Sequence, residues 1–217
     1  MGKQTKVSKE IIISAYTKMI LEEGKKPNSI YHFCQLLKIE ETQFYEFYAT
    51  FQQIEDSVFE TFFENTLKLL NKSEDYASYD AKTKVLSFYF TFFELLTANR
   101  SLVLRLLSQE KNNLENLKKL SGLRKHFKKY IDSLGIETVN IPQQQIQKVQ
   151  QKSISELAWV QMMLTLKFWM EDKSPSFEKT DIYIEKSVNA SFELLDITPF
   201  KNIIDFGKFL WKENMNN

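Results

Sequence analysis

The segment from Glu41 to Tyr45 carries side chains that can recognise the edges of DNA bases. Gln43 can pair with adenine through two hydrogen bonds, Thr42 can contact a thymine methyl group, and Glu41 can accept a hydrogen bond from cytosine N4. These side chains can act together only if the segment that holds them is a helix lying in the major groove. The chemistry that this segment suggests is therefore recognition of DNA.

No other set of side chains has the spacing of a catalytic or metal-binding site. The two histidines, His32 and His126, lie far apart in the sequence and have no partner at metal-ligand spacing. Adjacent carboxylates such as Glu22 and Glu23 point to different faces of a helix, which does not suit paired acid–base chemistry. Glycine-rich phosphate loops and nucleophile elbows do not occur in the sequence. We therefore expect a protein that is not an enzyme and that uses no metal ion and no cofactor.

The base-contacting segment belongs to a group of three short amphipathic helices. Residues 30–37 place apolar side chains at positions i, i+3, i+4 and i+7, which form one face of a helix. The pattern restarts at residues 40–47 after a tight junction at Ile39, and residues 11–21 supply a third helix. The apolar residues of the pattern are Ile12, Ala15, Tyr16, Met19, Ile20, Ile30, Phe33, Cys34, Leu37, Phe44, Phe47 and Tyr48. This arrangement is typical of a helix-turn-helix.

In this register, residues 8–60 resemble the DNA-binding domain of TetR-type regulators. The pattern of that family reads roughly A-G-V-S-x-x-T-L-Y-x-H-F-x-x-K-E-x-L, and residues 37–54 of this chain read LKIEETQFYEFYATFQQI. The aromatic and aliphatic positions agree, whereas the polar positions differ. The positions that match in type are Ile39, Phe44, Tyr45, Tyr48 and Ile54.

The differences from the family pattern bear on DNA binding. Lys38 stands where a glycine usually eases a left-handed turn, at a cost of roughly 1 kcal/mol if the backbone is unchanged. Glu40 and Glu41 replace a serine and an often basic residue, and Phe51 replaces a lysine that commonly meets phosphate. The first fifty residues carry seven Lys and six Glu, which is little excess positive charge for a DNA-binding head.

The resemblance implies a helix-turn-helix head over residues 1–50 and a ligand-binding and dimerisation body over residues 51–217. The positions of Ser29 and Tyr45 contact phosphates in many relatives, and the implied partners are operator DNA and a small apolar effector. Two late helices, over residues 152–172 and 176–195, would pair with a second subunit and form a homodimer. The predicted DNA-binding residues are Ser29, Lys38, Glu41, Thr42, Gln43 and Tyr45.

Composition favours an all-α protein. Only five Gly and four Pro occur in 217 residues, too few for the turns of an all-β sandwich, whereas a hydrophobic content of 43% is ample for a core. The net charge of +1 is too small to give an overall positive field that would attract nucleic acid. The single cysteine, Cys34, is expected to be a reduced core thiol. The N-terminus carries no secretion signal and no apolar run reaches about 18 residues, so we expect a cytoplasmic protein without stable membrane insertion.

Helical periodicity continues through the whole chain and predicts roughly ten helices and no strand. The first helix runs from about Ser8 to Glu23, and Gly24 is well placed to end it. Ser174 and Pro175 form a helix start signal. The helices expected in the body span residues 51–70, 82–97, 99–107, 111–134, 143–171, 177–195 and 200–211.

The body is rich in large apolar side chains, which either pack in the core or line an apolar pocket. The helix expected over residues 82–97 is apolar nearly all round, so it must be enclosed by others or line a cavity. The predicted ligand-binding residues are Phe90, Phe93, Phe127, Trp159, Met163 and Trp169. The predicted dimer-interface residues are Trp159, Met162, Leu166, Val188 and Phe192.

The helix expected over residues 111–134 has one basic face. This face comprises Lys118, Lys119, Arg124, Lys125, Lys128 and Lys129. A basic amphipathic helix can bind a membrane surface or an acidic partner, but a solvated helix face is the interpretation that we favour.

Two functions fit these patterns. The first is a ligand-responsive, DNA-binding transcriptional regulator of the TetR type, acting as a repressor. The second is a TetR-like fold that has lost DNA binding and handles lipid, similar to the ubiquinone-biosynthesis lipid-binding accessory proteins, which share this fold. The register of the motif favours the first function, and the charge of the head favours the second.

Overall fold

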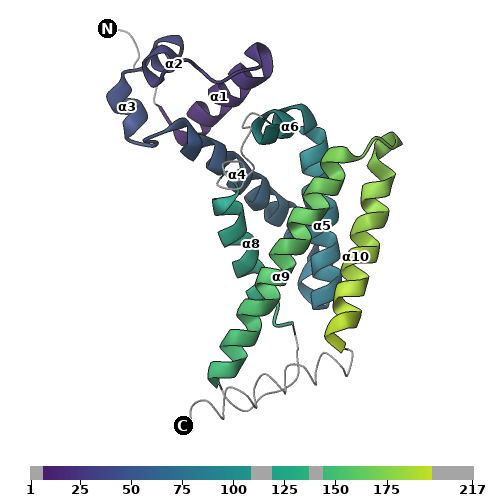
Figure 1. The fold of residues 1–217 in the computed structure, drawn as a ribbon. Helices are drawn as coiled ribbons and strands as arrows, with labels where there is room; N and C mark the ends of the chain where they lie inside the picture. The colour runs from purple at the N-terminus through teal and green to yellow at the C-terminus, as the bar shows by residue number, and fades with distance from the viewer. Residues whose placement is uncertain (1–6, 109–118, 137–143, 197–217) are drawn as a thin grey trace, which may run out of the picture. The chain divides into compact units, whose positions relative to one another are not determined.

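The computed structural model describes residues 7–108, 119–136 and 144–196, with the backbone alone at 144–153 and 196. These residues form nine α-helices and two short 3-10 helices, with no strand among them, which confirms the predicted all-α fold (Figure 1). The helix expected over residues 200–211 lies outside the described part of the chain. The elements are α1 (Lys9–Glu23), α2 (Ile30–Leu37), α3 (Glu41–Tyr45), α4 (Phe51–Leu70), η1 (Glu74–Ser78), α5 (Ala81–Ala98), α6 (Arg100–Ser108), α8 (Ser121–Ser133), α9 (Gln144–Glu171), η2 (Pro175–Phe177) and α10 (Glu178–Asp196).

The ends of several helices follow from local sequence signals. The Ser8 hydroxyl caps α1 by accepting from the Ile11 N–H at 3.4 Å. Gly24 ends the same helix in the left-handed conformation, with φ of 72°, which a residue without a Cβ adopts at little cost. Pro175 begins the short η2 turn, but Ser176 and Phe177 have positive φ, so the helix expected over residues 177–195 begins at Glu178 as α10. These signals fix where helices begin and end, and packing then decides which faces they bury.

The chain divides into two compact units. Unit 1 comprises residues 1–67 and 92–126, and unit 2 comprises residues 68–91 and 127–217. Helices α4, α5 and α8 contribute residues to both units. The division of the chain into a head and a body at residue 50 stays a prediction.

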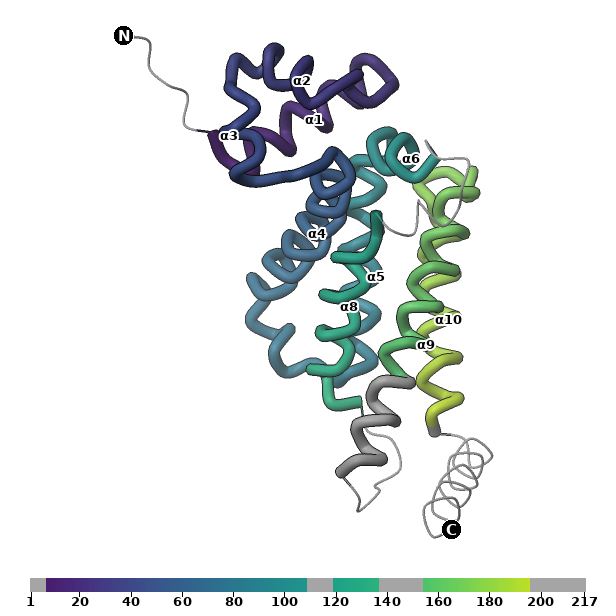
Figure 2. Tube along the Cα trace, turned by 60° about the vertical axis from the view of Figure 1, so that its left-hand side comes forward, coloured from purple at the N-terminus to yellow at the C-terminus, as the bar shows by residue number. Residues whose placement is uncertain are grey.

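An aromatic cluster holds the first three helices of unit 1 against the start of α4. Figure 2 shows α1, α2 and α3 gathered near the start of α4. The Tyr16 ring of α1 stacks on Phe51 at a centroid distance of 5.4 Å, and Phe33 of α2 meets the same ring at 5.7 Å. Phe44 of α3 lies 6.1 Å from Phe33 and is fully buried. Three helices that are too short to bury themselves thus share one core.

Unit 1 also buries a charged network around Glu55 of α4. The Tyr16 hydroxyl donates to Glu55 Oε1 at 2.7 Å, and Lys26 Nζ lies 3.1 Å from the same oxygen. Lys119 Nζ lies 3.2 Å from Glu55 Oε2 and donates to the Leu106 carbonyl of α6 at 2.6 Å. Glu55 Oε2 has no well-oriented hydrogen bond in the described structure, so the nearby ammonium group stabilises it by charge. The network ties α1, α4 and α6 to the segment before α8.

The expectation that Lys119 lies on a solvated basic face is wrong, because its side chain is fully buried. Lys119 lies in a turn that precedes α8, so the helical phase of α8 does not fix its direction. Arg124, Lys125 and Lys129 do lie exposed on α8, and Lys118 lies outside the described residues. The attraction of the Glu55 carboxylate accounts for the inward turn of Lys119.

Unit 2 has a core of packed rings. Phe88 stacks on Tyr130 at 4.9 Å and meets Phe127 at 5.5 Å, and Phe127 lies 6.4 Å from Trp159 of α9. The Tyr130 hydroxyl donates to the Lys84 carbonyl at 3.0 Å. Offset and edge-on ring pairs of this kind add to the apolar area that each ring buries. These rings join α5, α8 and α9.

Helices α9 and α10 lie side by side and run in opposite directions (Figures 1 and 2). Asp172 shapes the turn between them: its Oδ1 accepts from the Ser174 N–H and hydroxyl, and its Oδ2 accepts from the Thr180 N–H and hydroxyl, at 2.7–3.0 Å. Burial alone would raise the pKa of this carboxyl, but the four donors outweigh it and lower the pKa to about 2.

Candidate DNA-contact helix and apolar cavity

The turn between α2 and α3 is made by Lys38 in the left-handed conformation. Its φ is 55° and its ψ is 45°. The Lys38 N–H donates to the Gln35 carbonyl at 3.2 Å and the Ile39 N–H donates to the Cys34 carbonyl at 3.1 Å, which ends α2 sharply. The left-handed turn expected at position 38 is therefore confirmed, although a lysine occupies it. This turn directs the chain into α3.

Helix α3 is a short element anchored by one buried ring. Phe44 faces the core, whereas Thr42 is exposed and Tyr45 is about half exposed. Gln43 Oε1 accepts from the Glu40 N–H at 3.0 Å and so caps the helix. A bidentate contact to adenine requires this amide to leave the cap. The Thr42 and Tyr45 side chains are thus accessible, whereas the Gln43 carbonyl oxygen is engaged in the cap.

The other predicted DNA-binding residues lie at the ends of α2 and at the start of α3. Ser29 caps α2, with its hydroxyl accepting from the His32 N–H at 3.1 Å, and it remains exposed. Lys38 is exposed, and Glu41 is partly exposed in the first turn of α3. A carboxylate at a helix N-terminus is favourable for the helix, but it repels a phosphate backbone. The DNA-binding role of these residues stays a prediction.

Phe51 does not take over the role of the phosphate-contacting lysine found at its position in the family. Its ring lies in the aromatic cluster of unit 1, between Tyr16 and Phe33. The position therefore contributes to packing of the helix-turn-helix and removes one cation from the surface that would face DNA.

An apolar cavity of about 470 Å³ lies in unit 2 between α5, α8, α9 and α10. Val85 and Tyr89 of α5 and Ile131 of α8 contribute to its wall, and none of the described side chains that line it is charged. The polar groups of the wall satisfy each other: Gln161 Nε2 donates to Ser187 Oγ at 3.2 Å, and the Ser191 hydroxyl donates to Gln161 Oε1 at 3.1 Å. Such a cavity suits an uncharged apolar molecule.

None of the six predicted ligand-binding residues lines this cavity. Phe127 and Trp159 lie in the ring core, Phe93 and Trp169 are buried elsewhere, and Phe90 is exposed. The wall consists mostly of aliphatic residues, whereas the residues predicted to bind the ligand are mostly large aromatic ones. The signal that points to them is the spacing of Leu157, Gln161 and Leu164 on one face of α9. The ligand-binding role of the six residues stays a prediction.

The predicted dimer-interface residues lie mostly inside the protomer. Trp159, Met162, Leu166 and Val188 are buried within unit 2, and Phe192 lines the apolar cavity. Other apolar side chains of the same two helices face outward. The large ones that are about half exposed or more are Leu157, Val160, Leu164, Ile182 and Leu194.

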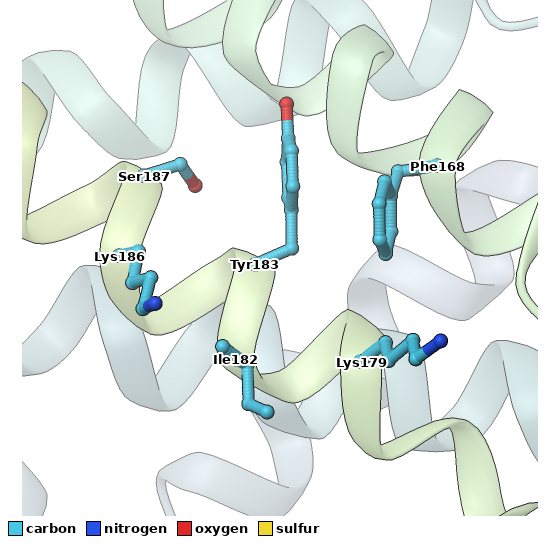
Figure 3. A pocket seen from close by; sticks show the side chains of 6 residues that line it. All are labelled: Phe168, Lys179, Ile182, Tyr183, Lys186 and Ser187. Carbon is cyan, nitrogen blue, oxygen red and sulfur yellow. The ribbon is translucent and has the colours of Figure 1, made fainter. Parts of the chain in front are cut away.

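A second hollow, of about 460 Å³, adjoins the apolar cavity along α9 and α10. Figure 3 shows the rings of Phe168 and Tyr183 face to face, with Lys179 and Lys186 on the same helix as Tyr183. The two ring centroids are 4.5 Å apart. Tyr183 and Ser187 line both hollows, so the two form one continuous surface.

Three short helices with a sharp turn between α2 and α3, in a chain whose described residues are otherwise helical, define a helix-turn-helix fold. A family profile described as "Tetracyclin repressor-like, C-terminal domain" matches residues 84–210, more than half of the chain. The protein belongs to the TetR family of regulators. No curated protein matches the sequence.

In the described residues, no three His, Cys, Asp or Glu side chains lie close enough together to hold a metal ion. Within the same ranges, no helix has both the length and the apolar character needed to cross a membrane.

Proposed function

We propose that the protein is a homodimeric transcriptional repressor that binds operator DNA through α3 and releases it when a small apolar effector binds the body. The observation that carries this proposal is the turn at Lys38, which leads from α2 into an α3 whose Thr42 and Tyr45 side chains are exposed. Membership of the TetR family supports it.

In the DNA complex, Gln43 and Thr42 would contact bases, and the Tyr45 hydroxyl would donate to a phosphate. Among the described residues 7–50, the exposed lysines are Lys9, Lys18, Lys25 and Lys38, of which Lys18 lies 3.8 Å from Glu22. Lys26 already pairs with Glu55, so few of these cations are available for phosphate contact. Each phosphate neutralised contributes a slope of about −0.9 to the dependence of log affinity on log salt, so the salt dependence should be shallow.

The effector would be an uncharged apolar molecule, because the described wall of the cavity of unit 2 contains no charged residue. A charged group placed there would lose its hydration without gaining a counter-ion. Gln161 uses one N–H and one lone pair in the bonds to Ser187 and Ser191, so its amide can also offer the effector a hydrogen bond.

The test is the binding of purified protein to labelled DNA from its own upstream region, measured by fluorescence anisotropy across a salt series. Gln43→Ala should reduce sequence preference at a cost of about 1–3 kcal/mol. Tyr45→Phe should weaken binding to all sequences about equally. Tyr79→Phe, a tyrosine of unit 2, is the matched control and should leave binding unchanged. If the wild type does not bind this DNA at low salt, the repressor proposal fails for that DNA.

A second candidate is a TetR-fold protein that has lost DNA binding and carries lipid or another apolar molecule. The observations that favour it are the acidic start of α3, at Glu40 and Glu41, and the uncharged cavity. It predicts an apolar molecule that co-purifies with the protein and no DNA binding at low salt. Under this function Gln43→Ala and Tyr45→Phe change nothing, and Glu41→Lys creates weak, non-specific binding to DNA.

A further inference from the structure

The apolar cavity of unit 2 is one part of a longer apolar surface. It shares Tyr183 and Ser187 with the hollow of about 460 Å³ that lies further along α9 and α10. We call the cavity and this hollow together the ligand trough. Along α10 the trough extends from Leu195 to Lys179, a distance of about 24 Å at the usual rise of a helix. A molecule that fills the trough must therefore be elongated.

The two ends of the trough differ in charge. None of the described side chains that line the cavity is charged, whereas Lys179 and Lys186 line the hollow. The two lysines are seven residues apart on α10, so they lie on one face of the helix at a separation of about 10 Å along its axis. Figure 3 shows them on either side of Ile182. One end of the trough is thus purely apolar and the other end is apolar with a basic edge.

The described residues do not neutralise these two lysines. Both side chains are exposed, and neither ammonium group makes an ion pair within the described part of the chain. The exposed carboxylates of α10 do not line either hollow; they belong to Glu178, Asp181, Glu185 and Glu193. The stem of a lysine packs on apolar surface while its ammonium group stays in water. The positive charge at this end is therefore available to a ligand.

We propose that the ligand trough binds a single-chain amphiphile that ends in a carboxylate, such as a fatty acid anion. The apolar chain lies in the cavity, and the carboxylate lies in the hollow between Lys179 and Lys186. The described lining contains no arginine, the residue that binds phosphate through two parallel hydrogen bonds, so we assign the head group as a carboxylate. This ligand is a second class beside the neutral effector, and the inference rests on the proposed function only in taking the cavity as a ligand site.

The two parts of the trough have different roles in binding. The chain supplies most of the binding free energy, because each methylene group that leaves water for the cavity contributes. The exposed lysines contribute less, but they decide which end of the ligand lies in the hollow. Since Leu157, Leu164 and Leu194 are more than half exposed, a chain can enter the cavity from its side while the carboxylate stays hydrated. The amphiphile and the neutral effector then exclude each other from one cavity.

The first test compares ligands that share one chain and differ in the head group, by isothermal titration calorimetry below the concentrations at which they form micelles. Dodecanoate should bind about three- to tenfold more tightly than the neutral dodecanol, as two exposed ion pairs allow. This advantage should shrink in high salt. Equal affinities, or a cationic dodecyltrimethylammonium that binds as tightly as dodecanoate, overturn the proposal. Dodecyl phosphate that binds more tightly than dodecanoate contradicts the carboxylate head group.

The second test removes the charge of the two lysines. The double variant Lys179→Gln with Lys186→Gln should bind dodecanoate only as tightly as dodecanol, and its affinity for dodecanol should stay unchanged. Lys68→Gln, an exposed lysine of α4 that lines neither hollow, is the matched control and should keep the preference for dodecanoate. A double variant that keeps the preference, or a control that loses it, contradicts the role of the hollow.

The third test concerns the chain. Decanoate has two methylene groups fewer than dodecanoate and should bind about tenfold more weakly. Ala190 is exposed and lines the cavity, so Ala190→Trp should fill the place of the chain and weaken dodecanoate and dodecanol alike. Circular dichroism checks that this variant is folded, and Ala190→Phe replaces it if it is not. An affinity that does not depend on chain length, or a folded variant with full affinity, shows that the chain lies elsewhere and overturns the proposal.

The upstream-DNA assay separates this proposal from the proposed function. If the wild type binds its upstream DNA but does not prefer dodecanoate to dodecanol, the repressor role stands and the amphiphile site is wrong. If dodecanoate binds as expected but no DNA binds, the amphiphile site stands and the repressor role is wrong.

Discussion

Each unit of the protein has its own kind of centre. Unit 1 has a buried charged network beside its aromatic cluster, whereas the centre of unit 2 consists of packed rings. Unit 1 buries a carboxylate, Glu55, with the Lys119 ammonium 3.2 Å away and the Tyr16 hydroxyl donating to it. Unit 2 buries rings, with Phe88 between Tyr130 and Phe127. A buried charge stabilises only when its partners are in place, whereas rings stabilise through area and tolerate small shifts. The helices joined by the Glu55 network should therefore tolerate smaller shifts than the helices joined by the rings of unit 2.

Among the largest expected effects is that of Lys119→Met, which leaves the buried Glu55 with Lys26 and the Tyr16 hydroxyl near its other oxygen. Removing one member of a buried ion pair costs about 3–5 kcal/mol, because the remaining charge loses part of its compensation. Urea unfolding followed by circular dichroism measures the loss. A change below about 1 kcal/mol would show that the network does not stabilise unit 1.

The matched control is the double variant Glu55→Gln with Lys119→Met. The amide keeps an acceptor for the Tyr16 hydroxyl but removes the stranded charge. The double variant should therefore recover part of the stability lost in Lys119→Met, giving a coupling free energy of about 0.5–3 kcal/mol. If the losses simply add, the charge is not the cause.

Phe127→Ala tests the ring centre of unit 2 and should cost about 3–5 kcal/mol, because Phe127 is fully buried and contacts Phe88, Tyr89 and Trp159. The loss comes from a cavity rather than from a charge. Phe127→Leu fills much of this cavity and should lose less than half as much. Equal losses in the two variants, measured by urea unfolding, would contradict an area-based ring centre.

A smaller effect is expected at Asp172, the buried carboxylate of unit 2 that lies at the end of a helix rather than in the core. Asp172→Asn should lower stability at neutral pH by about 1–2 kcal/mol, because an amide cannot accept all four hydrogen bonds. The folded pKa of about 2 is below the usual value of 3.8, so the stabilising contribution is present above pH 4. It is lost as the pH falls from about 4 to about 2.

Urea unfolding of both proteins between pH 2 and pH 7 checks this prediction. The difference in unfolding free energy should shrink as the pH falls, and the variant itself should lack this part of the acid dependence. A difference that stays constant over this range would mean that Asp172 does not act through its charge.

The smallest effect concerns a polar contact within the ring centre. The Tyr76 and Tyr130 hydroxyls lie 2.8 Å apart, and Tyr130 uses its own proton on the Lys84 carbonyl, so Tyr76 is the donor. Tyr76→Phe should cost about 1 kcal/mol, since Tyr130 keeps its own acceptor. Thermal unfolding measures it, with Tyr79→Phe as the control. A loss as large as that of Phe127→Ala would show that polar contacts dominate unit 2 as well.

Helix positions followed from local sequence because periodicity, caps and turn residues act over a few residues. The boundaries of α4 agree with the expected helix over residues 51–70. The αL turn at Lys38 followed from aligning its position with a glycine of the family pattern. Each of these features depends on neighbours within one or two helical turns.

The buried network and the cavity could not be predicted in this way, because they depend on residues far apart in the chain. Lys119 pairs with Glu55, which lies 64 positions earlier, and nothing in the local pattern separates Lys119 from the exposed lysines of α8. The cavity wall combines residues from four helices, and large rings such as Phe127 pack against one another instead. Size and apolarity predict burial, but they do not tell whether a side chain faces a cavity.

The left-handed backbone at Lys38 has a consequence for the evolution of heat resistance. A glycine at this position would relieve about 1 kcal/mol of conformational strain and offer a simple route to a more heat-resistant protein. It would also remove an exposed cation near α3. Under the proposed repressor function, selection for thermal tolerance and selection for operator affinity would therefore act on this residue in opposite directions.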